Sequence, residues 1–186
     1  MIELPIFWIS GPPAAGKTTL CAALLEHYPL GVHLPVDDMR QWVVSGLADA
    51  VPWTEETERQ FQIAETAACS VARRYHEAGF AVAIDHCRNP KRLDEVIGDE
   101  LAGIAVVKVM LLPGLEENLR RNRERTNKDF DPRVLEETIE YTNGAYGEDL
   151  PSDWMLLNNT TLTVDDSVLA VLRRAQREKT VPACKM

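Results

Sequence analysis

Short apolar runs alternate along the chain with longer stretches in which apolar residues recur every three or four positions. A continuous apolar run predicts a strand buried on both faces, and the three-to-four spacing predicts a helix with one buried stripe. Strands are predicted over residues 6–10, 32–36, 80–85, 104–112 and 154–158. Their alternation with helices is typical of βαβ units and predicts an α/β fold with a parallel sheet that helices cover on both faces.

Capping residues and turns place helices over 17–27, 54–79, 131–146 and 163–179. Thr54 is a favourable N-cap, and Thr163 with Asp166 has the spacing of a capping box. The expected buried faces are Phe61, Ala64, Ala68, Val71 and Tyr75 in the second helix and Val164, Val168, Val171 and Ala175 in the last.

The composition is that of one globular domain. The chain has 186 residues, of which 45% are hydrophobic and 26% charged, which suits a single α/β domain with its own core. No linker or repeat divides residues 1–186. Within them, the charged segment 120–132 lacks an apolar period and is predicted to be a mobile lid, and the tail 180–186 is expected to fray.

Charge and cysteine content narrow the function classes. Lys and Arg total 20 against 29 Asp and Glu, so the net charge is -9, which disfavours sequence-independent binding to nucleic acid. The four cysteines form no CxxC pair and are expected to be free thiols of a reducing compartment. The first residues have neither a basic region nor a long apolar run, so we expect a cytoplasmic protein with no membrane partner.

A phosphate-binding motif joins the first predicted strand to the first predicted helix. In GxxxxGK[ST], backbone N–H groups and the positive end of the helix surround the phosphates, the lysine reaches the β- and γ-phosphates, and the hydroxyl ligates Mg²⁺. A glycine-rich turn that binds nothing is the alternative, and the match at every fixed position between a strand and a helix disfavours it. The residues predicted to bind ATP are Gly11, Pro12, Pro13, Ala14, Ala15, Gly16, Lys17, Thr18 and Thr19, with Thr18 on Mg²⁺.

Two aspartates follow predicted strands at the edge where open α/β sheets bind ligands. Asp37, just after the second strand, could accept a proton from a substrate hydroxyl as it attacks the γ-phosphate. Asp85 ends the third strand and could hold Mg²⁺ or orient the substrate. A helix cap at Asp37 and a turn residue at Asp85 are the alternatives, and the residues alone do not decide which aspartate is the base.

The predicted lid begins with an arginine cluster. Guanidinium groups stabilise the negative charge that phosphoryl transfer spreads over oxygen atoms. Arg121 and Arg125 are four residues apart, so we expect them to share one helix face and to act in catalysis beside Lys17. A solvated basic helix face is the alternative. The cluster comprises Arg120, Arg121, Arg123 and Arg125.

A guanine-reading motif is incomplete in this chain. GTPases carry NKxD, whereas Asn127-Lys128-Asp129 is followed by Phe130. The sequence therefore favours ATP over GTP.

In this order, the phosphate-binding motif, Asp37-Asp38-Met39-Arg40, Asp85 and the arginine lid resemble the small P-loop kinases, over about residues 6–175. Members with a similar pattern are polynucleotide 5′-kinases, chloramphenicol phosphotransferase and gluconate-kinase-like proteins. The resemblance implies a three-layer fold whose five parallel strands have the order 2-3-1-4-5, with residues 156–161 near the adenine.

The resemblance also implies roles for individual residues. It makes Asp37 the base, places Arg40 on the acceptor or its phosphate, puts Asp85 near Mg²⁺ and substrate, and sets Arg121 and Arg125 on the nucleotide phosphates. The sequence that follows Asp85 is not the Thr-Asn of polynucleotide kinases, which argues against a nucleic-acid acceptor.

The acceptor itself stays open. Trp53 could stack on a sugar or base, although such aromatic residues also serve packing. Three functions are compatible with the motifs: a kinase for a small hydroxylated molecule, a polynucleotide 5′-hydroxyl kinase, and a nucleotide-binding regulatory module with little turnover. The residues expected on the acceptor side are Asp37, Arg40, Trp53, Asp85, His86 and Arg88.

Overall fold

The computed structural model describes residues 4–126, 131–148 and 150–180, with side chains as far as Arg177. The incomplete guanine motif at 127–130, Cys184 and the tail beyond 180 lie outside these residues. The strands are β1 Ile6–Ser10, β2 Gly31–Pro35, β3 Ala81–His86, β4 Val106–Leu111 and β5 Met155–Leu157. The helices are α1 Lys17–Leu25, α2 Val36–Arg40, α3 Glu55–Glu77, α4 Pro90–Glu100, α5 Leu115–Glu124, the 3-10 helix η1 Pro132–Leu135, α6 Glu136–Ala145 and α7 Val164–Thr180.

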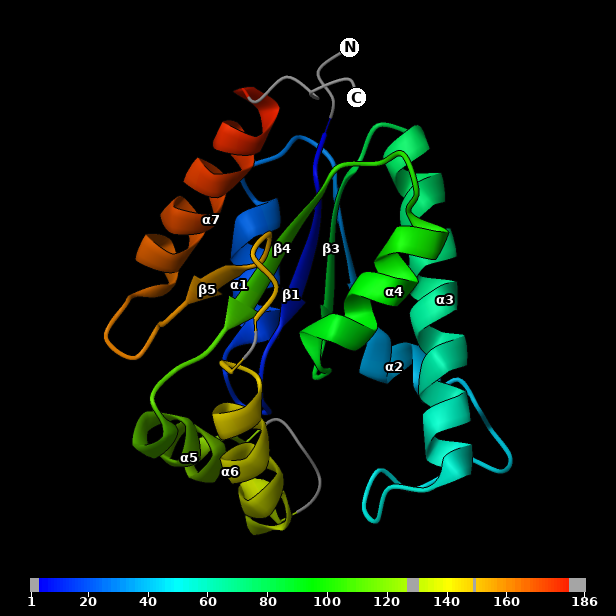
Figure 1. Ribbon diagram of the computed structural model, residues 1–186, viewed down its shortest axis with the longest axis vertical. Helices are drawn as coiled ribbons and strands as arrows, with labels where there is room; N and C mark the ends of the chain where they lie inside the picture. Colours follow the sequence, from blue (N-terminus) through cyan, green and yellow to red (C-terminus); the bar gives the residue numbers. More distant parts are fainter. Residues whose placement is uncertain (1–3, 127–130, 149, 181–186) are drawn as a thin grey trace.

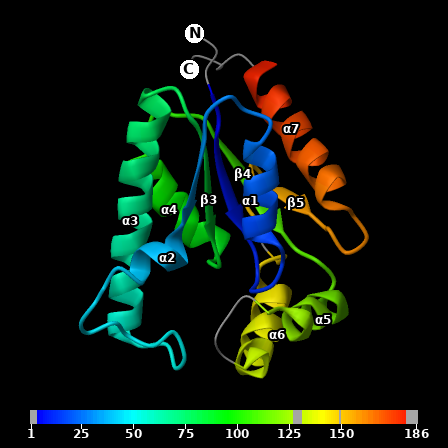
Figure 2. The same cartoon turned by 180° about the vertical axis from the view of Figure 1, so that it is seen from behind.

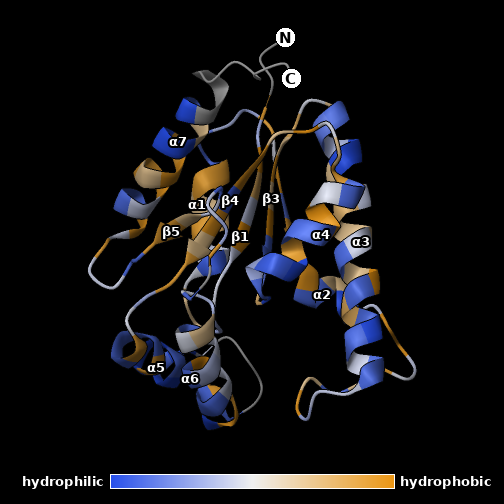
Figure 3. Cartoon of the chain, in the orientation of Figure 1, coloured by the Kyte–Doolittle hydropathy of each residue, from blue (hydrophilic) through white to orange (hydrophobic). Residues whose placement is uncertain are grey.

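The five strands form one parallel sheet in the order β2-β3-β1-β4-β5, which confirms the predicted fold (Figure 1). Helices α1 and α7 cover one face of the sheet, and α3 and α4 cover the other (Figure 2). Because the sheet is covered on both faces, its central strands consist mostly of apolar residues, and polar residues such as Asp85 and Lys108 interrupt the hydrophobic colouring (Figure 3).

The central strand β1 supplies both cores. All five of its residues are buried, and successive side chains point to opposite faces. Ile6 and Trp8 pack with α3 and α4, whereas Phe7 and Ile9 pack with α1 and α7. Since β1 is fixed from both sides, the loop that follows it starts from a rigid support.

Several predicted bounds shift. Strand β2 ends at Pro35, because Val36 begins the short helix α2, and α1 ends at Leu25 rather than at residue 27. The Thr54 cap is confirmed, as is the capping box of Thr163. Helix α4 was not predicted, although Asn89 caps it and Pro90 occupies its first turn.

Two members of the predicted helix faces lie outside the core. Tyr75 in α3 is 39% exposed and Val164 in α7 is 42% exposed. Each lies in an end turn of its helix, beyond the part that packs on the sheet. The three described cysteines, Cys21, Cys69 and Cys87, are free. In the part of the chain that the structure describes, no helix has the length and apolar character to cross a membrane.

Candidate active site

The loop between β1 and α1 has the backbone that a phosphate cradle requires. A Cβ atom on Gly11 would lie 2.3 Å from the carbonyl oxygen of Leu111, so only glycine fits there. Gly16 has a φ of 96° and Ala14 a φ of 61°, both left-handed values that curl the chain back toward α1. The loop therefore presents its N–H groups around the start of α1, where the helix dipole favours an anion.

Lys17 lies over this loop. Its Nζ donates hydrogen bonds to the carbonyl oxygens of Gly11 at 3.0 Å and Pro12 at 2.9 Å. These contacts hold the ammonium group at the rim of the cradle, in reach of a bound polyphosphate. The residues present thus fit a nucleoside triphosphate: a ring of amide donors, an ammonium group and the exposed hydroxyl of Thr18.

Asp85 at the end of β3 meets the phosphate loop. Thr18 Oγ1 donates to Asp85 Oδ2 at 3.1 Å, and His33 Nε2 lies 2.6 Å from the same oxygen. The hydroxyl and the carboxylate are oxygen ligands, which Mg²⁺ prefers, so this pair fits the predicted metal site. His33 was not predicted; its signal is a polar residue inside an otherwise apolar strand next to β3.

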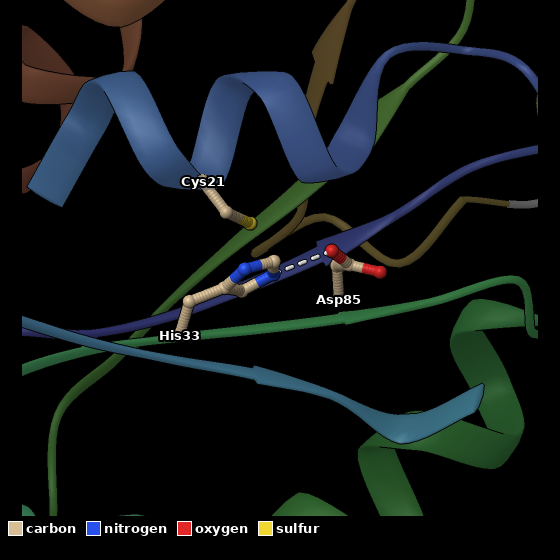
Figure 4. A group of neighbouring side chains, drawn as sticks. All are labelled: Cys21, His33 and Asp85. Atoms are coloured by element: carbon tan, nitrogen blue, oxygen red, sulfur yellow. Dashed lines mark hydrogen bonds and ion pairs between the residues drawn. The ribbon is translucent and has the colours of Figure 1, made fainter. Parts of the chain in front are cut away.

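Cys21 completes a group with these side chains (Figure 4). The sulfur of Cys21 and one ligand atom each of His33 and Asp85 lie within 4.8 Å of one another, contributed by α1, β2 and β3. Burial, and then the charge of Asp85, raises the pKa of the Cys21 thiol well above its usual value, and Lys17 only partly opposes this. Because a metal binds the thiolate, this sulfur is a poor ligand. The contacts that hold the Asp85 carboxylate are those of Thr18 and His33.

The next residue of β3, His86, contacts Asp37, the other predicted aspartate. His86 is 1% exposed, and its Nδ1 lies 3.4 Å from Oδ1 of Asp37 in α2. Its Nε2 lies 3.2 Å from Oε1 of Glu65, a fully buried carboxylate in α3. Burial lowers the pKa of His86, but the hydrogen bonds and charges of Asp37 and Glu65 raise it by more, so the net direction is upward.

Glu65 was missed by sequence reasoning. It follows Phe61 by four residues and precedes Ala68 by three, so it occupies the predicted buried face of α3. An acidic residue in a buried stripe is the signal that was available, because a buried carboxylate requires polar or charged partners.

Arg88 and Trp53 lie in contact with each other near His86. The Arg88 guanidinium pairs with Glu58 and lies 3.0 Å from Glu65 Oε1, and it also lies over the Trp53 ring at 5.2 Å. Trp53 stacks on Phe61 with centroids 5.1 Å apart. The two predicted acceptor residues therefore lie together, and each already has contacts within the protein.

Arg40 anchors the segment that follows α2. Its Nη1 donates to the carbonyl oxygen of Ala48 at 2.6 Å, and its guanidinium lies 4.5 Å from the centroid of the Phe61 ring. Gln60 of α3 fixes the same segment through the backbone of Gly46 and Ala48. The structure thus gives Arg40 a structural role beside Asp37, and its predicted contact with the acceptor remains a prediction.

The arginine cluster divides into different groups. Arg120 pairs with glutamates of its own helix and Arg123 pairs with Glu136, and both side chains are more than half exposed, as expected of a solvated helix face. Arg121 instead turns inward. It donates to the carbonyl oxygen of Asn159 at 2.9 Å and lies 3.4 Å from that of Ala15 in the phosphate loop.

The expectation that Arg121 and Arg125 share one helix face is wrong. Helix α5 ends at Glu124, and Arg125 has an extended backbone conformation. Burial lowers the pKa of Arg125. Helix α5 packs through buried asparagines: Asn118 donates to the carbonyl oxygen of Pro13 and Asn122 to that of Pro132.

A protein-family comparison agrees with this geometry. The family model described as an AAA domain matches residues 6–148, which include the phosphate loop, both aspartates and α5. No curated protein sequence is significantly similar to this chain.

Solved structures share the fold at low sequence identity. A sugar kinase from Janibacter sp. HTCC2649 has 17% identity and a TM-score of 0.66, over 98% of this chain and 99% of that one. A gluconokinase from Sinorhizobium meliloti 1021 has 15% identity and a TM-score of 0.68, over 95% and 94%. The tunicamycin resistance protein of Deinococcus radiodurans has 18% identity and a TM-score of 0.64, over 92% and 95%. The chain therefore has the fold of these three proteins along nearly its whole length.

Proposed function

This chain belongs to the AAA-domain family, and from that premise we propose that it transfers the γ-phosphate of ATP to a hydroxyl group of a small acceptor molecule. The phosphate loop is common to kinases, GTPases and mechanical ATPases, so the loop alone does not select a kinase. The selection rests on what lies beside the loop at the carboxyl ends of β2 and β3.

The observation that carries the proposal is that two consecutive residues at the end of β3, Asp85 and His86, contact the two parts of the candidate site. Asp85 accepts a hydrogen bond from the hydroxyl of Thr18, which follows the phosphate loop, and His86 contacts Asp37. The end of β3 therefore brings the predicted Mg²⁺ ligands, Thr18 and Asp85, near the half-exposed carboxylate of Asp37 in helix α2. A phosphate donor site with a carboxylate next to it is the arrangement that a hydroxyl kinase needs.

Each group has a defined task in this proposal. Mg²⁺, held by Thr18 and Asp85, would neutralise part of the charge on the β- and γ-phosphates. Lys17 neutralises charge from the rim of the cradle, and Arg121 braces the loop next to the nucleotide. Asp37 accepts the proton of the acceptor hydroxyl as its oxygen attacks the γ-phosphate.

The acceptor is proposed to be a small hydroxylated molecule. The sugar kinase and the gluconokinase with the same fold support a polyol or sugar-like compound. A polynucleotide acceptor would need a basic path to Asp37. Arg88 is paired with Glu58 and Glu65, and Arg92 with Glu95, so these two arginines are already neutralised within the protein.

The test is a panel of sugars, polyols, nucleosides, antibiotics and 5′-hydroxyl oligonucleotides, scored for acceptor-dependent ADP release with Mg-ATP. We expect one class of small acceptor to raise ADP release, with the phosphorylated acceptor found by mass spectrometry. The variant Asp37→Asn is the control and should bind Mg-ATP without transfer. Preferential phosphorylation of oligonucleotides would replace the small acceptor, and tight Mg-ATP binding without turnover on any acceptor would favour a regulatory module.

A further inference from the structure

We propose that His86 is a positioning residue for the phosphotransfer proposed above: held by Glu65, it fixes the direction of the Asp37 carboxylate. The contacts of His86 are taken from the geometry, and their effect on phosphotransfer rests on the proposed function. The residues involved come from three elements, α2, β3 and α3, which packing holds together.

His86 is itself immobilised. Its side chain is 1% exposed, and its ring lies 5.2 Å from that of Phe61. Its Nε2 meets Glu65 Oε1 at 3.2 Å, and Glu65 is fully buried on a helix of 23 residues. The same Glu65 oxygen lies 3.0 Å from Nε of Arg88. A ring fixed on one edge by a buried carboxylate and packed on an aromatic face has little freedom to rotate.

Asp37 lies closer to solvent than His86. Its side chain is 53% exposed, and α2 has only five residues. The direction of its carboxylate decides whether it faces an acceptor hydroxyl. The Nδ1 edge of His86, 3.4 Å from Asp37 Oδ1, favours a rotamer in which this oxygen faces the ring. This separation is longer than an ordinary hydrogen bond, and such contacts often tighten once substrate is bound.

A purely structural role explains less of this arrangement. Placing the carboxylates of Glu65 and Asp37 and the imidazole of His86 in or beside the core has a desolvation cost unless each group faces a partner. An apolar residue at position 86 would fill the same space without that cost. The two ring nitrogens face two different acids, one buried in α3 and one at the reaction site. The contacts from Glu65 to His86 and from His86 to Asp37 therefore connect the candidate base to helix α3.

A matched pair of variants separates positioning from packing. In His86→Asn the side-chain amide nitrogen lies near the position of Nδ1 and can still donate to Asp37, whereas in His86→Gln it lies near that of Nε2 and can only reach Glu65. With the best acceptor of the panel, we expect His86→Gln to lower kcat by about tenfold more than His86→Asn, with the KM for ATP unchanged. The exposed His27→Gln is the control and should match the unsubstituted protein.

A purely structural role would make the two variants equally impaired, or would raise the KM for ATP in both, and either result overturns the proposal. A second measurement needs no acceptor. In protein labelled with ¹⁵N-histidine, Asp37→Asn should shift the Nδ1 resonance of His86, and the neighbouring Asp38→Asn should not. An Nδ1 resonance that ignores Asp37→Asn overturns the positioning role even if transfer is observed. If the panel yields no transfer but the resonance moves, the proposed function fails while the contact stands.

Discussion

The Thr18 hydroxyl donates a hydrogen bond of 3.1 Å to Asp85, and this contact joins two parts of the chain that are 67 residues apart. Thr18 lies in the first turn of α1, just after the phosphate loop, and Asp85 lies near the end of β3 beside β1. Parallel strands bring their carboxyl ends to one edge of the sheet, so both groups meet where a ligand binds. The pair is the most direct structural support for a Mg²⁺ site.

The first prediction concerns this pair. Thr18→Val removes the hydroxyl while keeping the branched shape, and we expect it to raise the Mg²⁺ concentration for half-maximal ADP release on the order of tenfold. Thr18→Ser keeps the hydroxyl and should stay close to the unsubstituted protein. Magnesium titrations at saturating ATP measure the effect. Equal Mg²⁺ dependence in the two variants would remove Thr18 from the metal site.

The second prediction separates donor binding from proton transfer. Lys17→Ala should abolish detectable binding of Mg-ATP in calorimetry, because the ammonium group is the charge nearest to the cradle. Asp37→Asn should retain the Mg-ATP affinity and lower kcat by about 10²–10⁴-fold, the usual contribution of a general base. Parallel loss of nucleotide affinity in both variants would exclude Asp37 as the base.

The third prediction distinguishes two neighbouring arginines. Arg121 connects α5 to the phosphate loop and to the segment after β5, whereas Arg120 pairs only with Glu117 and Glu124 of its own helix among its described contacts. We expect Arg121→Ala to weaken Mg-ATP binding by about tenfold, the equivalent of one charged hydrogen bond. Arg120→Ala should change it less than twofold, since exposed pairs contribute about 0–1 kcal/mol. The reverse order of effects would contradict this assignment.

The sheet and the phosphate loop were predictable because both depend on local pattern. The central strands are short and mostly apolar, and the loop motif has fixed residues at fixed spacings. A helix was expected only at the arginine cluster, and the earlier turns of α5 escaped prediction for a physical reason. Its buried positions are Asn118 and Asn122, which donate to backbone carbonyl oxygens, so its inward face carries no apolar period.

The partners of the site residues depend on tertiary structure. Asp37 and Asp85 could be chosen from their positions after strands, but nothing local indicates that His33 approaches Asp85 or that Glu65 approaches His86. Those contacts arise only when α3 and β2 pack beside β3. The spacing argument for Arg125 failed because it assumed that the helix continues through Arg125, whereas α5 ends at Glu124.

The fourth prediction concerns the stability of the phosphate loop. Gly11→Ala places a Cβ atom 2.3 Å from the carbonyl oxygen of Leu111, so the backbone must shift, at a cost of about 1–3 kcal/mol in the free energy of unfolding. Gly98→Ala is the matched control. Gly98 lies inside α4, where an added Cβ has no described atom within 4 Å apart from the nearby backbone of its own helix, and alanine there should stabilise by about 0.5–1 kcal/mol. Urea unfolding measures both, and a neutral Gly11→Ala would show that the loop can relax.

The last prediction concerns acid stability and the pair of Glu58 with Arg88. The hydrogen bond from Arg88 lowers the pKa of Glu58 below its usual 4.5; burial opposes this, and Gln62 and the charges of Arg88 and Arg92 add to it. Since the folded state holds this proton more weakly than the unfolded chain, the pair contributes stability above about pH 4.5 and loses it as the pH falls through the lowered pKa. Glu58→Gln should therefore be less stable than the unsubstituted protein near pH 7, and the difference should shrink steadily below pH 4.5. Urea unfolding from about pH 7 to pH 3 measures this, with Glu55→Gln as a control for the loss of one negative charge in the same helix turn. A stability difference that is constant with pH would mean that Glu58 acts through packing. The contact between Arg88 and Trp53 would then not depend on the ion pair with Glu58.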